Sequence, residues 1–159
     1  MVRKHVVAYT DGSALGNPGP GGYGAILRNG EHEKELSGGF RNTTNNRMEI
    51  MAAIEALKAL KEPCRVTLYT DSQYLANAIT KGWAERWQRN NWMRNKSERA
   101  LNPDLWAVLL ELCRTHEVEF SWTRGHAGNA LNERCDRLAR EAALQPNLPP
   151  DVGYIRAGG

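Results

Sequence analysis

Three short segments near the start of the chain have the apolar and polar pattern of β-strands. They cover residues 5–10, 23–28 and 33–40, and Asn29-Gly30 has the composition of a tight turn. The segments follow one another at the spacing of β-hairpins. The pattern therefore predicts a three-stranded antiparallel meander.

The pattern then changes to the period of an α-helix over residues 43–60. Apolar side chains recur there every three or four positions, at Ile50, Ala53, Ile54, Leu57 and Leu60. Pro63 follows and ends the helix. A strand is predicted at residues 65–70 and a short helix from residue 72. Because strand–helix–strand crossovers are right-handed, the fourth strand should lie parallel to the first.

The rest of the chain predicts a helix, a strand and a last helix. Asn102 and Pro103 have the composition of a helix start, and apolar residues alternate from Val118 to Trp122 as in a fifth strand. The last helix covers residues 132–144. We expect one α/β domain over residues 1–145, and a flexible tail over residues 146–159, which are rich in Pro and Gly.

Composition limits the function classes. The 159 residues are 41% hydrophobic and 25% charged, which is typical of a single globular domain. No stretch approaches the roughly 20 apolar residues of a membrane span, and the first residues lead directly into a strand, so we expect a cytoplasmic protein without membrane contact. Three cysteines without C-x-x-C spacing indicate neither a disulfide framework nor a zinc site.

The tripeptide Tyr-Thr-Asp occurs twice, each time at the end of an apolar strand. The copies end at Asp11 and Asp71. If the two strands are parallel neighbours, both aspartates lie at the same sheet edge, where open α/β sheets usually bind ligands. Taken singly, either could be a turn or helix-cap residue.

Two more acids lie next to apolar helix faces. Glu49 precedes Ile50 in the first long helix, and Asp136 follows Cys135 in the last. Each alone could be a surface acid. Four acids at one sheet edge would repel one another unless a cation lay between them. Their oxygen ligands favour Mg²⁺ or Mn²⁺ over zinc.

The glycine-rich stretch at residues 12–24 does not fit a phosphate-binding loop. It lacks the Lys-Ser/Thr that ends such a loop, and it leads into a strand where such a loop leads into a helix. We therefore do not expect nucleoside triphosphate binding.

Basic and aromatic residues are interleaved in the segment 81–106, which we call the tryptophan segment. Between residues 81 and 104 it holds six Lys/Arg against three Asp/Glu, with Trp83, Trp87 and Trp92 among them, and Trp106 follows. This composition suits a groove that follows a phosphate backbone, although a buried aromatic stripe is an equal alternative. Amides that could read base edges and 2′-hydroxyls occur at Asn17, Asn45, Asn46 and Gln73.

His126 lies in a glycine-flanked loop just before the helix that carries Asp136. Most loop histidines have no chemical role. Beside a metal site, however, a side chain with a pKa of about 6.5 is a credible proton carrier.

Four long motifs resemble the bacterial ribonuclease HI family. They are TDGSALGNPGPGGYGAIL, TTNNRMEIMAAIEAL, YTDSQY and GHAGNALNERCDRLA, and they occur in the family's order and spacing. The resemblance implies a ribonuclease H-like fold, with a five-stranded mixed sheet and helices on both faces. It also implies an endonuclease that cuts the RNA strand of an RNA–DNA hybrid.

The resemblance also implies roles for single residues. Asp11, Glu49, Asp71 and Asp136 match the family's metal-binding carboxylates, and His126 matches its loop histidine. Residues that match the hybrid-reading positions are Gly12, Asn17, Asn45, Asn46 and Gln73. Thr44 and Asn17 match the DNA-phosphate pocket, and the tryptophan segment, with Trp83, Trp87 and Trp106, matches the basic protrusion.

Two features depart from the family pattern. The tryptophan segment carries Glu85 and Glu98, which make it less basic, and Asn-Ala-Leu stands near His126 where relatives often have His-Pro-Glu.

The sequence therefore predicts two-metal phosphodiester hydrolysis by a monomer, with two Mg²⁺ ions, for which Mn²⁺ can substitute, and an RNA–DNA hybrid as partner. Products should carry 5′-phosphate and 3′-hydroxyl ends. The alternatives are a DNA-cutting or strand-transferring enzyme of the same fold, and a hybrid-binding module without catalysis.

Overall fold

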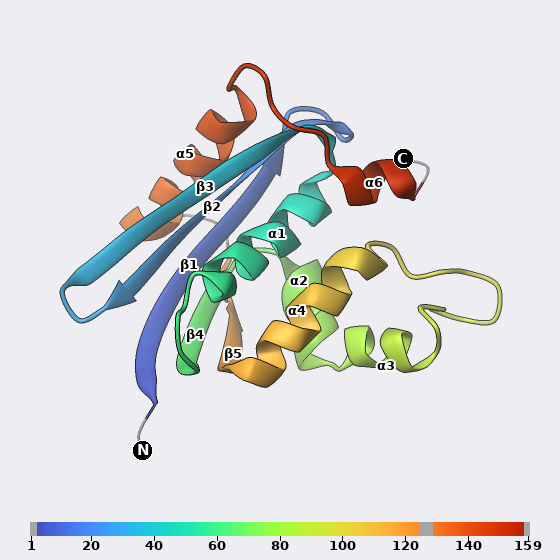
Figure 1. Cartoon of the computed structure of the whole chain (residues 1–159), viewed down its shortest axis with the longest axis horizontal. Helices are drawn as coiled ribbons and strands as arrows, with labels where there is room; N and C mark the ends of the chain where they lie inside the picture. Colours follow the sequence, from blue (N-terminus) through green and yellow to red (C-terminus); the bar gives the residue numbers. More distant parts are fainter. Residues whose placement is uncertain (1–2, 125–128, 158–159) are drawn as a thin grey trace.

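A five-stranded mixed sheet forms the centre of the structure. The computed structural model describes residues 3–124 and 129–157 (Figure 1). Its strand order is β3-β2-β1-β4-β5. The strands are β1 (Lys4–Ala14), β2 (Gly19–Asn29), β3 (His32–Thr43), β4 (Cys64–Thr70) and β5 (Glu117–Trp122). β1 to β3 form the antiparallel meander, and β4 and β5 continue parallel to β1. The predicted fold class is confirmed.

The register between β1 and β4 explains the repeated tripeptide. Tyr9 lies opposite Tyr69, and their rings stack with centroids 5.2 Å apart. Thr10 and Thr70 point to the other face and are buried, and the Thr10 hydroxyl donates to the Tyr69 carbonyl at 3.0 Å. Matching residues therefore stand at matching heights on two parallel neighbours.

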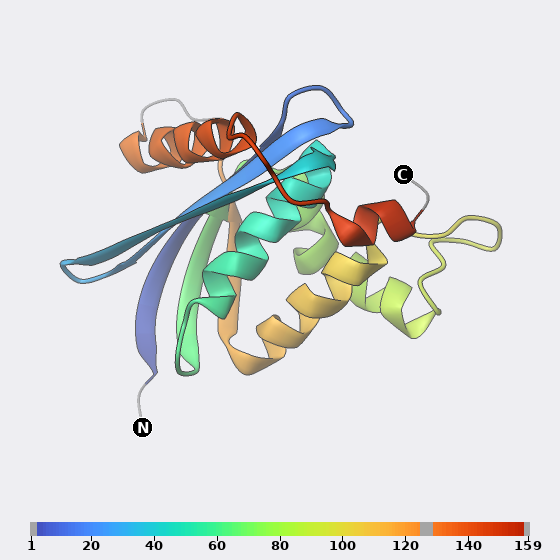
Figure 2. The same ribbon diagram turned by 45° about the horizontal axis from the view of Figure 1, so that its top comes forward.

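Helices cover both faces of the sheet. The helix α5 (Ala130–Ala143) packs on the face formed by β1, β2 and β3, and α1 (Asn45–Lys58) packs on the opposite face (Figure 2). The remaining helices lie on the α1 side, around β4 and β5 or beyond α1 (Figure 1). They are α2 (Gln73–Thr80), α3 (Trp83–Arg89), α4 (Pro103–Thr115) and α6 (Val152–Arg156).

The main hydrophobic core lies between the sheet and α1, α2 and α4. Leu68 of β4, Ile50 of α1 and Leu109 of α4 are all 0% exposed within it. Burial of such side chains stabilises the fold by roughly 1.5–3 kcal/mol each. The core fixes the height of α1 on the sheet.

The structure extends the predicted strands and adds two short helices. β2 begins at Gly19 and β3 ends at Thr43, both beyond the predicted bounds. β1 runs on to Ala14, so Asp11 lies within the strand. The short helices α3 and α6 have no counterpart in the sequence prediction, since helices this short carry little periodicity. None of the described helices is long and apolar enough to cross a membrane.

The segment after α5 differs from the loose tail that its composition suggests. Asp151 is only 4% exposed, and its carboxylate pairs with Arg47 of α1 at 2.7 Å. Composition does not reveal this attachment, because it depends on one acid among many turn-forming residues. The mobility of residues 146–159 and the domain boundary at residue 145 stay predictions.

One histidine is part of the scaffold. His116, at the end of α4, is 4% exposed, and its Nδ1 accepts a hydrogen bond from the Cys64 backbone N–H at 3.0 Å. Its ring also bonds to the Leu57 backbone, and burial lowers the pKa of His116 below the ordinary 6.5. Protonation would place a second N–H against that of Cys64, so the neutral ring is required.

Lowering the pH from about 7 to about 5 should destabilise the wild-type protein more than a His116→Asn variant. The contribution of a histidine with a lowered pKa is complete above its unfolded pKa of about 6.5 and is lost as the pH falls below it. Asparagine can still accept from Cys64 but does not titrate. Urea unfolding across this pH range measures the difference, and exposed His32→Asn serves as the control. Equal pH dependence in wild type and His116→Asn would contradict the assignment.

Candidate active site

The parallel pairing of β1 and β4 places two aspartates at one sheet edge. Asp11 is 3% exposed within β1, and Asp71 is the first residue after β4. The Trp122 indole donates to the Asp71 carbonyl at 3.0 Å, which holds the backbone there. Ser72 caps α2, its hydroxyl accepting from the Leu75 N–H at 3.1 Å. Asp71 is therefore not the cap of that helix.

Glu49 reaches the same edge because α1 crosses very close to β1. A Cβ on Gly12 would collide with the backbone of Met48 and Glu49, so only glycine permits this approach. Glu49 is 6% exposed. Gly12 thus sets the distance between the helix that carries Glu49 and the strand that carries Asp11.

The three carboxylates converge. One ligand oxygen from each of Asp11, Glu49 and Asp71 lies within 4.8 Å of the others. Asp136 of α5 lies next to Asp11 and also pairs with Arg140 at 2.7 Å; it is not a member of that close trio. The sequence prediction that these acids gather at one edge agrees with this placement.

A second glycine brings α5 to the site. Gly24 lies opposite Asp11 on β2, and a Cβ there would meet the Cys135 carbonyl and the Leu138 side chain. The Cys135 thiol donates to the Tyr9 carbonyl at 3.2 Å. Sequence reasoning missed Gly24 and Trp122 as supports of the site. A glycine inside a strand often marks such a close approach, whereas nothing in the sequence points to Trp122.

Burial and mutual repulsion raise the pKa values of the site's acids. Burial, followed by the negative charges of Asp71 and Asp136, raises the pKa of Asp11 to about 8. Burial also raises the pKa of Glu49 well above its usual range, with further increases from Asp11 and Asp71. The site is therefore short of positive charge.

This donor set fits a hard divalent cation. The three carboxylates supply oxygen ligands, as Mg²⁺ and Mn²⁺ require. Glu49 Oε1 is buried and has no hydrogen-bond partner among the residues that the structure describes, which is costly for a polar atom unless something occupies its lone pairs. Asp11, Glu49 and Asp71 could hold such an ion.

Three predicted hybrid-contacting residues lie together where the loop between β1 and β2 meets the start of α1. The Asn17 side-chain oxygen accepts from the Asn45 N–H at 3.0 Å, and the Asn45 side-chain oxygen accepts from the Ala14 N–H at 3.3 Å. Thr44 caps α1, its hydroxyl accepting from the Arg47 N–H at 3.2 Å. Asn17 and Asn45 are exposed and Thr44 is half-buried. We call Asn17, Thr44 and Asn45 the amide cluster.

The other polar candidates lie at the rim of the carboxylate site. Asn46 is exposed in the first turn of α1, next to the amide cluster, and Gln73 is exposed at the start of α2, two residues after Asp71. Gly12 follows Asp11 in β1 and is buried. Their contact with a hybrid stays a prediction.

The tryptophan segment divides into a buried part and an open part. Trp106 is 0% exposed and packs edge-on against Tyr74 and Trp87, with ring centroids 5.4 and 6.2 Å apart. The prediction that Trp106 contacts substrate is therefore corrected: it belongs to the core. Trp83 and Trp87 are half-buried and line a cavity of about 460 Å³ with Arg86 and Arg94.

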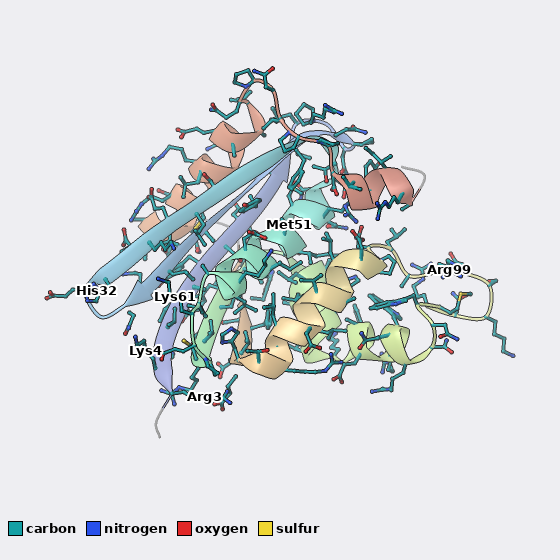
Figure 3. The ribbon with its side chains drawn as sticks, in the orientation of Figure 1. Arg3, Lys4, His32, Met51, Lys61 and Arg99 are labelled. Carbon is teal, nitrogen blue, oxygen red and sulfur yellow. The ribbon has the colours of Figure 1, made fainter. Side chains whose placement is uncertain are left out.

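The acids of the tryptophan segment neutralise part of its positive charge. Glu98 pairs with Arg94 at 2.7 Å, and Glu85 approaches Arg89 at 3.9 Å. Arg99 lies on the loop between α3 and α4, far from the β2–β3 turn (Figure 3). The segment is thus a modestly basic surface, as the sequence indicated.

His126 lies outside the described residues, which resume at residue 129. Its predicted role as a proton carrier stays a prediction.

Comparison with known proteins identifies the chain's relatives. Residues 3–144 match the family described as RNase H. The chain is 65% identical over 152 residues to a ribonuclease H of Syntrophus aciditrophicus, covering 96% of this chain and 88% of that protein. It is 63% identical over 149 residues to one of Desulforamulus reducens, covering 94% of each.

A solved structure agrees with these relatives. The crystal structure of LC9-RNase H1, a type 1 RNase H with the type 2 active-site motif, superposes with a TM-score of 0.80 at 34% identity, covering 90% of this chain and 74% of that one.

Replacing Asp71 with asparagine should stabilise the metal-free protein. The substitution removes one of the charges that repel Asp11 and Glu49 but keeps the side chain's size. With EDTA at about pH 8, the free energy of unfolding should rise by about 1 kcal/mol or more, with a higher Tm. Added Mg²⁺ should narrow the gap, because wild type gains more from the ion.

Glu119→Gln, an exposed acid-to-amide change on β5, is the matched control and should leave Tm near wild type. An Asp71→Asn variant whose Tm in EDTA equals that of wild type would show that the carboxylates do not repel as argued.

Proposed function

Because the chain belongs to the ribonuclease H family, we propose that its carboxylate edge hydrolyses the RNA strand of RNA–DNA hybrids with the help of two divalent cations. Cleavage of the RNA of a hybrid is the activity of the family to which the chain belongs. The observation that carries the metal assignment is the convergence of Asp11, Glu49 and Asp71 within 4.8 Å.

The site's own residues would hold the reacting groups. Asp11, Glu49 and Asp71 would bind the cations, and Asp136 would complete the acidic wall beside Asp11. Two bound divalent cations supply activation of the attacking water and stabilisation of the leaving 3′-oxygen. Mg²⁺ is the proposed ion, and Mn²⁺ can substitute for it. The products would carry 5′-phosphate and 3′-hydroxyl ends.

Selection of the RNA strand would come from polar groups beside the carboxylates. Asn46 and Gln73 are exposed at this edge and can both donate to and accept from a 2′-hydroxyl. Within the amide cluster, Asn17 and Thr44 would bind a phosphate of the DNA strand, and Asn45 would read the hybrid beside Asn46. Trp83 and Trp87 would support the DNA strand further along the duplex.

Two expectations about the protein's context stay proposals. We infer a monomer, because the three converging carboxylates and the core that positions them come from a single chain. We also propose the cytoplasm as its location.

Activity on a labelled hybrid should disappear with EDTA and return with Mg²⁺ or Mn²⁺, while Zn²⁺ alone should restore little. The reason is that the ligands are all carboxylate oxygens, which suit hard cations. Asp71→Asn should cut at least roughly a hundredfold more slowly in Mg²⁺. Gel assays of initial rate measure both effects. Cleavage that persists in EDTA would contradict the metal assignment.

Cleavage assays should distinguish this function from the alternatives when they compare RNA–DNA, RNA–RNA and DNA–DNA duplexes of one sequence. We expect cleavage of the hybrid's RNA strand and at least roughly a hundredfold slower cleavage of the other duplexes. Faster cutting of duplex DNA would favour a DNA nuclease of the same fold. Tight hybrid binding without cleavage would favour a non-catalytic binding module.

A further inference from the structure

Arg47 is a fully buried cation on the first turn of α1. Its side chain is 2% exposed, and it lies two positions before Glu49. Its guanidinium makes two bidentate pairs. Nε and Nη2 donate to the two carboxylate oxygens of Asp151 at 2.7 and 3.0 Å, and Nη1 and Nη2 donate to those of Asp104 at 2.9 and 2.6 Å. Such fork-to-carboxylate pairs fix both distance and orientation.

Asp151 also holds the end of β3. The Thr43 hydroxyl donates to Asp151 Oδ2 at 2.7 Å, and Thr43 is 0% exposed. One buried carboxylate from the chain's C-terminal segment therefore binds the last residue of β3 and a residue of the first turn of α1. A second tie is the hydrogen bond from the Arg41 N–H to the Pro149 carbonyl at 2.9 Å.

The residues between Thr43 and Arg47 are those proposed to contact the hybrid. Thr44 accepts from the Arg47 N–H, and Asn45 is joined to Asn17. Two members of the amide cluster, Thr44 and Asn45, thus lie on a short bend whose two ends are both held by Asp151, and the third, Asn17, is hydrogen-bonded to this bend. Figures 1 and 2 show α6 beside the start of α1 in both views.

The residues around the pair of Arg47 and Asp151 are closely packed. A Cβ on Gly153, two residues after Asp151, would meet the Asp104 carboxylate and the Arg47 guanidinium. Asp151 also caps α6, its carboxylate accepting from the Tyr154 N–H at 3.4 Å. The Tyr154 ring lies 6.0 Å from the guanidinium of Arg47.

We propose that Asp151 is a positioning residue for substrate binding: by clamping Thr43 and Arg47, the C-terminal segment sets the geometry of the amide cluster that receives the hybrid. The inference rests on the proposed contact between this cluster and the substrate. Asp104 provides the contrast. It binds Arg47 from the α4 side, whereas the Thr43 hydroxyl bonds to Asp151. Within the described part of the chain, Asp104 thus anchors the arginine without spanning the bend.

Steady-state kinetics with an RNA–DNA hybrid test the proposal in the full-length protein. Asp151→Asn and Thr43→Val should each raise KM roughly three- to tenfold, the effect of one lost hydrogen bond transmitted to binding. kcat should stay within about twofold, because the carboxylate edge is not altered. The double variant should be no worse than the poorer single variant, since both changes break the same contact.

Asp104→Asn is the matched control. It removes a charged partner of the same arginine, and its KM should stay within about twofold of wild type even where its Tm falls as far as that of Asp151→Asn. Thermal melts of each variant are used to choose an assay temperature well below its unfolding transition. If KM follows Tm across all variants, Asp151 contributes only stability and the proposal is overturned.

Asn45→Ala separates this inference from the function on which it rests. An increased KM in Asn45→Ala together with a wild-type KM in Asp151→Asn and Thr43→Val would overturn the clamp and keep the substrate contact. An unchanged KM in Asn45→Ala would show that the amide cluster does not receive the hybrid, which overturns both. Should Asp151→Asn fail to fold, Thr43→Val alone decides, because it removes only a hydroxyl and leaves the Arg47 pairs intact.

Discussion

Like charges held together inside the fold are the constraint on which this structure depends. Asp11, Glu49 and Asp71 come from a strand, a helix and a strand end, and their carboxylates lie within 4.8 Å of one another. Desolvation and repulsion both oppose this arrangement. It persists because the surrounding contacts fix each backbone: the register of β1 on β4, and the close approach of α1 at Gly12. The scaffold thereby holds negative charges close together, and a divalent cation bound between them would neutralise their repulsion.

A buried cation close to Glu49 in the sequence pairs with acids outside the carboxylate site. Arg47, only two residues from Glu49, is directed away from the site into a pair of carboxylates, Asp104 and Asp151. Burial by itself would lower the pKa of Arg47, but those two partners raise it above its ordinary value. The guanidinium is therefore paired with Asp104 and Asp151 and does not neutralise the carboxylates of the site. The α1 helix thus carries a satisfied cation and an acid that lacks one, on neighbouring turns.

Much of the fold and of the carboxylate site could be predicted from the sequence, because local patterns and the resemblance to a known family were enough for these inferences. The alternation in the first strands, the helical period around Ile50 and the repeated Tyr-Thr-Asp led to the antiparallel meander, to the parallel pairing of β1 with β4 and to the meeting of Asp11 with Asp71. The parts that could not be predicted depend on contacts between distant segments. Trp106 belongs to a segment whose composition is typical of a nucleic-acid-binding groove. Its ring nevertheless packs in the core, against Tyr74 of α2 and Trp87 of α3. Asp151 resembles a tail residue in sequence and is buried by Arg47, more than a hundred positions earlier.

Paramagnetic relaxation by Mn²⁺ in a ¹⁵N-labelled sample tests the central claim most directly. At a substoichiometric amount of Mn²⁺, the amide signals of Gly12, Ile50 and Ser72 should broaden together, because these residues flank the three carboxylates on three separate elements. Signals of Asn29 and Cys64, near the opposite ends of β2 and β4, should stay sharp, and Glu49→Gln should weaken the effect at all three positions. Broadening that is absent at one of the three elements, or equally strong at Asn29 and Cys64, would contradict the binding of divalent cations by converging carboxylates.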